Sequence, residues 1–144
     1  MLRKSGIDAL KALLELALAP EAWRSTKELA QAQDLPAPML EQLLLRLRRA
    51  GVLVARRGRS GGYRLARPAR AISLAEVLSG LGDGAAEPAG DHQTSPADQV
   101  TAALARRLAR ARQQALAQLS LEDLVFDLRS AEASVDEDSG LLVG

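Results

Sequence analysis

The chain has 144 residues, of which 47% are hydrophobic and 26% charged, with a formal net charge of +1, one histidine and no cysteine. This length fits one domain with a real core, while the composition excludes a disulfide framework, a thiolate-bound zinc or iron–sulfur cluster, and catalysis that needs two imidazoles. Alanine and leucine supply 27 residues each and aromatic residues only three, which favours packed helices over a large β-sandwich.

The first half of the chain predicts three helices, at about 6–19, 26–33 and 37–50. A capping box, Ser25–Glu28, starts the second helix, and the turn 34–36 leads into the third. The residues expected to face the core from the first helix recur at helical spacing and are Ile7, Leu10, Leu13, Leu14, Ala17 and Leu18. Those expected from the third helix are Leu40, Leu43, Leu44 and Leu47.

The periodicity changes after Gly51, which stands where a helix C-cap glycine belongs. Residues 52–57 and 63–66 are short, partly alternating segments on either side of a glycine-rich turn, and they predict a β-hairpin. Gly61 and Gly62 permit positive φ angles and close backbone approach. We expect the ring of Tyr63 to pack against the hairpin.

The second half predicts a capped short helix at 73–81, a loop at 82–96, a long helix at 97–118 that begins at Ser95-Pro96, and a closing helix from 121 to about 129. Residues 132–144 are acidic and small, so we expect a disordered tail.

Three short helices followed by a glycine-tipped hairpin form the element order of a winged helix-turn-helix domain. The predicted fold class is mainly α with a small β-hairpin, in which a long C-terminal dimerisation helix follows the winged domain. The expected divisions are the winged domain at 1–81, a flexible sensor-type loop at 82–96, the dimerisation and closing helices at 97–131, and the tail at 132–144.

Charge is divided unevenly along the chain. Residues 1–70 hold 14 Lys and Arg against 6 Asp and Glu, whereas residues 71–144 hold 5 against 12. Residues 46–70 contain nine arginines and no acid. Such a density suits a polyanion, although a solvated basic loop is the alternative on charge alone.

The predicted winged domain offers side chains for duplex DNA. Glu41 can accept a hydrogen bond from a cytosine amino group and Gln42 can pair with adenine, while for Glu41 alone an ordinary solvated helix face is the alternative. Arginines on a thin hairpin tip suit a minor groove. The candidate DNA-binding residues are Arg3, Lys4, Lys27, Pro38, Met39, Glu41, Gln42, Arg46, Arg49, Arg57, Gly58, Arg59 and Ser60.

The long helix has apolar residues on two faces, which favours dimerisation over simple coverage of its own core. The candidate dimerisation residues are Val100, Leu104, Leu108, Ala111 and Ala115. A twofold homodimer implies a near-palindromic DNA site.

Several segments resemble the IscR-like (Rrf2) family of winged-helix transcription regulators over about residues 5–128. They are the first helix at 8–18, the recognition helix at 40–51, the wing signature at 57–66, and the segments 72–78 and 119–124. The resemblance implies a homodimeric regulator in which Glu41 reads bases and Arg57 and Gly58 contact the minor groove.

The chain departs from this family at three places. Ser5, Ile7 and Asp8 replace the usual basic residues and tyrosine around Gly6, so that Arg3 and Lys4 take over phosphate contacts that Asp8 opposes. Pro38 and Met39 stand at the head of the recognition helix instead of a small polar residue. We therefore expect a different preferred DNA site.

The largest departure lies in the sensor loop, where cluster-binding members carry three cysteines and this chain carries none. The remaining candidate ligands are Asp83, Glu87, Asp91, His92 and Asp98. Oxygen ligands and one imidazole do not replace thiolates for an iron–sulfur cluster, so we expect a member with no cofactor and no metal.

We therefore expect a cytoplasmic, dimeric, sequence-specific DNA-binding transcription regulator that acts as a repressor. The alternative is a winged-helix protein-interaction module with little DNA binding. An enzyme is disfavoured because the chain shows no nucleophile, nucleotide or flavin motif. No apolar run approaches the ~20 residues of a membrane helix, and the N-terminal stretch lacks the apolar core of a signal peptide.

Overall fold

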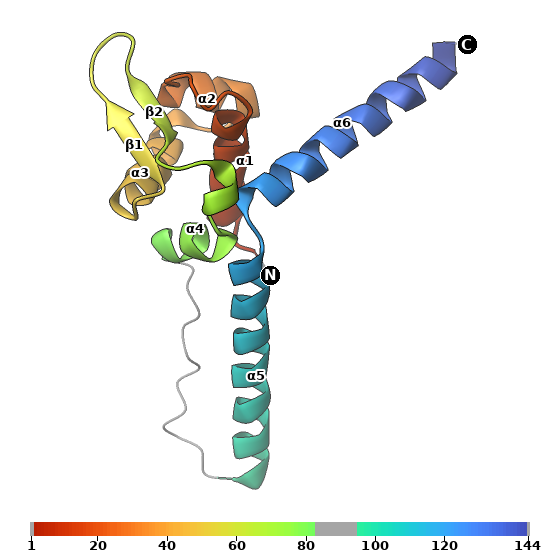
Figure 1. Ribbon diagram of the computed structural model, residues 1–144. Helices are drawn as coiled ribbons and strands as arrows, with labels where there is room; N and C mark the ends of the chain where they lie inside the picture. Colours follow the sequence, from red (N-terminus) through yellow and green to blue (C-terminus); the bar gives the residue numbers. More distant parts are fainter. Residues whose placement is uncertain (1, 83–94, 144) are drawn as a thin grey trace.

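The computed structural model describes residues 2–82 and 95–143 and contains seven named segments besides two strands (Figure 1). In chain order the elements are α1 (Lys4–Leu18), α2 (Thr26–Gln33), α3 (Ala37–Arg49), β1 (Leu53–Arg56), β2 (Gly62–Leu65), the 3-10 helix η1 (Ala69–Ala71), α4 (Leu74–Gly80), α5 (Pro96–Gln118) and α6 (Leu121–Val143). Helices α1 to α4 and the hairpin form one body, from which α5 and α6 project in different directions. The predicted fold class, mainly α with a small β-hairpin, is confirmed.

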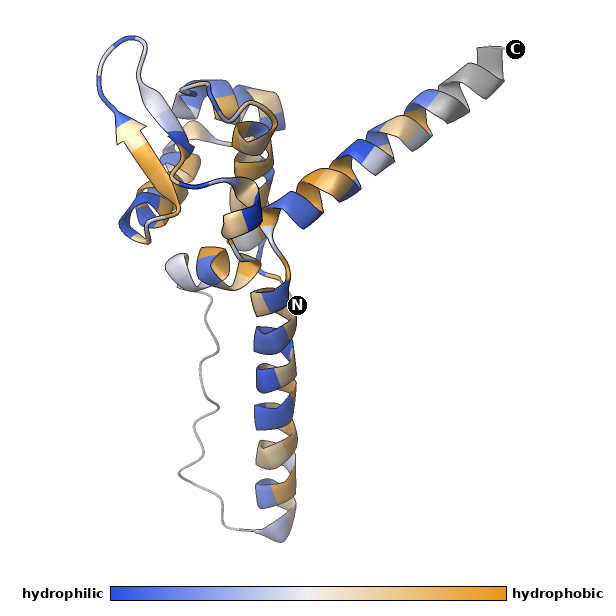
Figure 2. Ribbon diagram, in the orientation of Figure 1, coloured by the Kyte–Doolittle hydropathy of each residue, from blue (hydrophilic) through white to orange (hydrophobic). Residues whose placement is uncertain are grey.

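The core of this body is built mainly of leucines from α1, α2, α3 and α4, together with smaller contributions from the hairpin and the first turn of α6 (Figure 2). All four core positions predicted for α3 are buried. The prediction for α1 was wrong in part, because Ile7 and Leu18 are 41% and 38% exposed while Ala9 and Ala12 are fully buried. Alanine lets neighbouring helices approach closely, and a search for large apolar residues does not detect such a face.

Side-chain hydrogen bonds begin α2 and α4 where the sequence predicts. Both capping boxes are present, Ser25 with Glu28 at α2 and Ser73 with Glu76 at α4. The backbone amide and hydroxyl of Ser25, together with Arg24, hold the pKa of Glu28 below its usual range. Each box satisfies backbone amides that a helix start would otherwise leave without partners.

Strands β1 and β2 pair antiparallel, with Leu53 opposite Leu65 and Arg56 opposite Gly62. The segment before α2 pairs with β2 through an antiparallel β-bridge, in which the backbone amides and carbonyls of Arg24 and Tyr63 bond to each other at 3.0 and 2.8 Å. Gly62 has φ +140°, and a Cβ there would lie 2.3 Å from the carbonyl oxygen of Arg24. Gly61 is not in the positive-φ region, contrary to expectation; it is required because a Cβ would overlap the carbonyl oxygen of Arg56.

A second backbone pairing fixes the start of α6 to the winged body. The amide of Leu74 donates to the carbonyl of Leu119 at 2.8 Å, and the amide of Leu121 donates to the carbonyl of Ile72 at 2.9 Å. Leu121 and Val125 then pack into the core. The connection between α5 and α6 is therefore bonded to the segment that joins the wing to α4.

The end of α6 differs from the prediction. The helix continues to Val143, whereas the sequence predicted an end near Arg129 and a disordered tail at 132–144. Residues 130–139 contain no glycine or proline, and alanine and glutamate at 131–133 favour a helix. The sequence pattern also missed η1, while most of the predicted loop at 82–96 lies outside the described residues.

Candidate nucleic-acid interface

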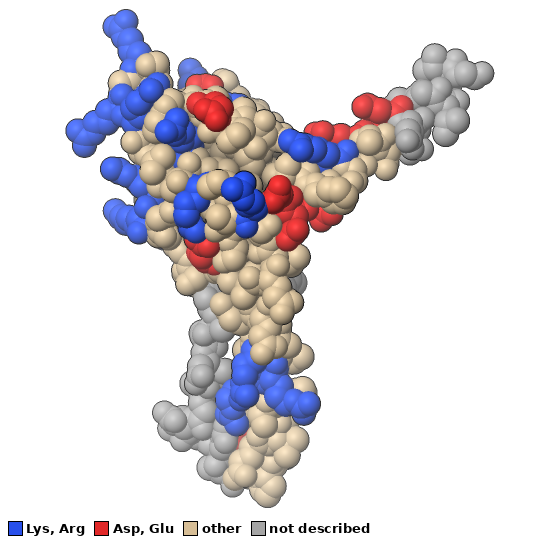
Figure 3. All heavy atoms as spheres, in the orientation of Figure 1, with Lys and Arg blue, Asp and Glu red and all other residues tan. Residues whose placement is uncertain are grey.

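Basic side chains gather over the hairpin and α3, on the opposite side of the winged body from α6 (Figure 3). Acidic side chains lie along α6. The uneven charge of the sequence is therefore also a separation in space, and the basic side carries the elements that a helix-turn-helix domain presents to DNA.

The exposed face of α3 follows from helical spacing. Pro38, Gln42 and Arg49 are exposed and recur at intervals that place them on one side of the helix. Met39 is half-buried and packs against the core. Arg46 is exposed, and its Nη1 lies 3.5 Å from the carbonyl oxygen of Leu81, just past α4.

Glu41 lies at the flank of this face, half-buried between α2 and the hairpin. The Tyr63 hydroxyl donates to Glu41 Oε1 at 3.0 Å, and the Thr26 hydroxyl donates to Glu41 Oε2. The alternative of an ordinary solvated position is therefore wrong for Glu41. Tyr63 packs in the core as expected and is 6% exposed. Burial, followed by the bond to Glu41 and the charge of Glu41, raises the pKa of Tyr63 to about 12.

The wing tip, defined as Arg57–Ser60, is exposed throughout. Arg56 turns back toward the hairpin, since its Nη2 donates to the carbonyl of Ser60 at 2.6 Å. Within the described part of the chain, neither Arg57 nor Arg59 makes a hydrogen bond or ion pair. These two guanidinium groups are therefore available for an external partner.

Trp23 lies between two arginines of the wing, a contact that sequence reasoning missed. The Cζ atoms of Arg56 and Arg64 lie 4.7 and 4.4 Å from the centre of its ring. Arg64 and Gly62 share one face of β2, and Gly62 stands opposite Arg56. The two guanidinium groups therefore reach the indole from neighbouring strands of the hairpin.

We expect Trp23→Leu to loosen this pairing. Amide hydrogen exchange at Tyr63, whose amide donates to Arg24, should accelerate roughly 5- to 30-fold, because two cation–π contacts of about 0.5–1 kcal/mol each are lost. Trp23→Phe keeps an aromatic face and should show a smaller change. Exchange at Tyr63 that stays at the native rate in the leucine variant would show that the indole does not hold the wing.

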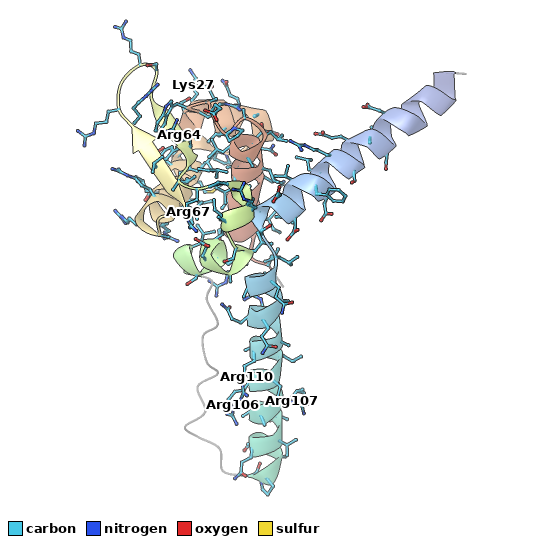
Figure 4. The ribbon with its side chains drawn as sticks, viewed as in Figure 1. Lys27, Arg64, Arg67, Arg106, Arg107 and Arg110 are labelled. Atoms are coloured by element: carbon cyan, nitrogen blue, oxygen red, sulfur yellow. The ribbon has the colours of Figure 1, made fainter. Side chains whose placement is uncertain are left out.

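The other predicted cationic residues lie in two places. Lys27, at the start of α2, and Arg64 lie at the end of the molecule that carries the wing (Figure 4). Arg3 and Lys4 lie at the opposite end of α1, where the neighbouring Leu2 lines an open apolar hollow of about 600 Å³ together with Leu108 of α5. The structure therefore does not bring Arg3 and Lys4 together with the wing. Asp8 is 4% exposed, so it does not face an external phosphate as expected.

Helix α5 carries an exposed apolar stripe. Val100, Leu104 and Leu108 are 69%, 54% and 62% exposed, and Ala111 and Ala115 continue the same face. None of the α5 residues, all of which the structure describes, is buried. Leu116, on another face, packs against the core, while Arg106 and Arg110 lie opposite the stripe (Figure 4).

The residues present do not fit an iron–sulfur cluster. The chain has no cysteine, and four of the candidate ligands, at positions 83, 87, 91 and 92, lie outside the described residues. Asp98 is exposed in the first turn of α5. In residues 2–82 and 95–143, His, Cys, Asp and Glu form no group of three or more that could hold a metal.

A helix-turn-helix unit beside an arginine-tipped hairpin defines a winged-helix DNA-binding protein. Residues 2–127 match the Rrf2 family, described as iron-dependent transcriptional regulators. The chain belongs to the Rrf2 family and is an IscR-like, DNA-binding transcriptional regulator without cysteines. The expected family is thereby confirmed.

Known relatives agree with this assignment. A helix-turn-helix transcriptional regulator of Synechocystis sp. is 41% identical over 139 residues, which are 94% of each chain. IscR of Cereibacter sphaeroides is 43% identical over 83 residues, covering 56% of this chain and 54% of that protein. These relatives are transcriptional regulators rather than enzymes.

Solved structures agree as well. IscR of T. potens superposes with a TM-score of 0.74 at 30% identity, covering 91% of this chain and 90% of that one. CymR, the global cysteine regulator of B. subtilis, superposes with a TM-score of 0.73 at 29% identity, covering 87% and 95%. Among the described helices, none combines the length and apolarity needed to cross a bilayer.

Proposed function

We propose that the protein is a homodimeric, sequence-specific repressor that binds a near-palindromic DNA site without an iron–sulfur cluster. The observation that carries this proposal is the pair of unengaged arginines on the wing tip beside the exposed face of α3. Because its relatives are bacterial and its partner is DNA, we propose a cytoplasmic location. Occupation of a site that overlaps a promoter would exclude RNA polymerase.

Each part of the interface has a role in this proposal. Gln42 reads adenine and Glu41 accepts from a cytosine amino group in the major groove. Arg57 and Gly58 contact the minor groove, where narrow A·T-rich segments attract arginine. Further contacts to phosphates and groove walls come from Lys27, Pro38, Met39, Arg46, Arg49, Arg59 and Ser60. Contact of Arg3 and Lys4 with phosphates also stays a prediction, because both residues lie at the N-terminal end of α1, away from the wing.

The exposed stripe of α5 supports the dimer. Three large apolar side chains more than half exposed on one helix face are costly in water, and a second copy of the same stripe would cover them. A twofold axis at α5 would place two copies of α3 on one side of a duplex, which requires an inverted repeat.

Independence from an iron–sulfur cluster rests on ligand chemistry. Such clusters are held by cysteine thiolates, with histidine replacing them at only part of some sites. This chain offers no thiolate and a single imidazole. Regulation through another effector, or through protein abundance, is consistent with this set of residues.

Selection of bound sequences from random DNA, with and without added ferrous iron, tests the proposal. We expect an inverted repeat to be enriched at low salt, and the same repeat and the same affinity after iron or a chelator is added. Transcription in vitro from a promoter with that repeat should fall when the protein is added. Failure to enrich any DNA at low salt would exclude the proposal, and stoichiometric capture of a protein with salt-insensitive binding would favour the interaction module.

A further inference from the structure

The carboxylate of Glu41 is bonded at both oxygens before any DNA is present. The donors come from two other elements, since Tyr63 belongs to β2 and Thr26 is the first residue of α2. An ionised carboxylate has about four acceptor positions, so two of them remain for an external donor. The two internal bonds therefore determine the direction in which the remaining positions point.

The position of Tyr63, which donates to the Glu41 carboxylate, is fixed by its surroundings. The residue is 6% exposed, and its backbone bonds to Arg24 in both directions. The glycine before it allows the two backbones to approach closely, because a Cβ at Gly62 would lie 2.3 Å from the carbonyl oxygen of Arg24. With its pKa raised to about 12, the Tyr63 hydroxyl stays protonated near neutral pH and remains a donor.

A fixed acceptor discriminates between base edges. Cytosine and adenine present an amino donor in the major groove, whereas guanine N7 and O6 and thymine O4 are acceptors. A carboxylate held in place favours the amino donor and repels the acceptor edges. If the same carboxylate were free to rotate, it would turn away from a guanine or thymine and so tolerate it.

We propose that Tyr63 is a specificity-positioning residue, whose hydroxyl fixes Glu41 so that α3 discriminates at one base pair, and that this bond couples the wing to base reading. The inference rests on the proposed function, because it requires Glu41 to face the major groove. It goes further by assigning a role in sequence choice to a wing residue that does not itself touch a base. Thr26 acts on the other carboxylate oxygen in the same way.

Selection of bound sequences with Tyr63→Phe, Glu41→Ala and the double variant tests this role. Glu41→Ala should reduce the preference at one base pair roughly tenfold. Tyr63→Phe should reduce the preference at the same pair roughly three- to tenfold, while affinity for the best site changes by less than about threefold. The double variant should equal Glu41→Ala, because Tyr63 acts only through the carboxylate.

Two further variants keep the result interpretable. Thr26→Val removes the other donor and should relax the same base pair. Thr101→Val removes a hydroxyl that bonds, among the described residues, to two backbone carbonyls of α5, and it should leave every preference unchanged. Melting temperatures of all variants confirm that each is folded.

The outcomes distinguish base reading by Glu41 from positioning of Glu41 by Tyr63. If Glu41→Ala relaxes one base pair but Tyr63→Phe leaves all preferences intact, the positioning role is wrong and base reading by Glu41 stands. If Tyr63→Phe weakens binding equally at all sequences, Tyr63 is only structural and the positioning role is also wrong. If Glu41→Ala changes no preference, Glu41 does not read a base, which overturns both.

Discussion

Arg57→Ala combined with Arg59→Ala is expected to weaken DNA binding on the order of 10- to 100-fold near physiological salt. Both side chains lie on the exposed wing tip with no internal partner among the described residues, so their loss removes contacts to DNA without disturbing the fold. Each lost contact to a phosphate should also reduce the slope of log affinity against log salt by about 0.9. Titrations at several salt concentrations measure both effects.

The matched control removes the same charge elsewhere. Arg106→Ala with Arg110→Ala takes two arginines from α5, opposite the apolar stripe, and should leave the affinity nearly unchanged. If the two double variants weaken binding equally, the wing acts only through net charge. An unchanged affinity and salt slope in the wing variant would remove the wing tip from the binding mechanism.

Leu104→Asp combined with Leu108→Asp is expected to convert the proposed dimer to a monomer. Both leucines are more than half exposed on one face of α5, and two carboxylates on each copy would have to be buried without partners if the interface closed. Affinity for the full inverted repeat should fall at least about 100-fold, because a monomer binds only one half-site. Sedimentation gives the mass, and titration with full and half sites gives the affinities.

Gln113→Asp provides the control, because Gln113 is exposed on the opposite side of α5. This variant should remain a dimer with native affinity. If the leucine variant also sediments as a dimer, the two copies meet through another surface and the assignment of α5 fails.

Much of the fold could be predicted because local signals set the element boundaries. The capping boxes at Ser25 and Ser73 start their helices where expected, and periodic leucines identified the buried face of α3. The end of α6 could not be predicted, since acidic composition suggests disorder but does not stop a helix. The error on α1 arose because buried alanines, such as Ala12, give no strong apolar signal.

The interface was less predictable than the fold. Exposure of Arg57 and Arg59 follows from a turn, and the sequence indicates it. The bond from Tyr63 to Glu41 joins residues far apart in the chain, and the stacking of Arg56 and Arg64 on Trp23 depends on the strand register. Only the tertiary structure brings these groups together, so no local pattern reveals which charged side chains are held and which are available.

The backbone pairing between residues 72–74 and 119–121 joins the C-terminal end of α5 to the winged body. A helix of 23 residues is about 34 Å long. Because its end is paired to the winged body, a rotation of the helix moves that body with it. In the proposed dimer, a tilt of α5 by about 5° about its N-terminal end would displace the winged body by roughly 3 Å. This displacement is close to the ~3.4 Å rise of one base-pair step. Small changes in the crossing angle between the two copies of α5 would therefore change the half-site spacing that the proposed dimer can bind.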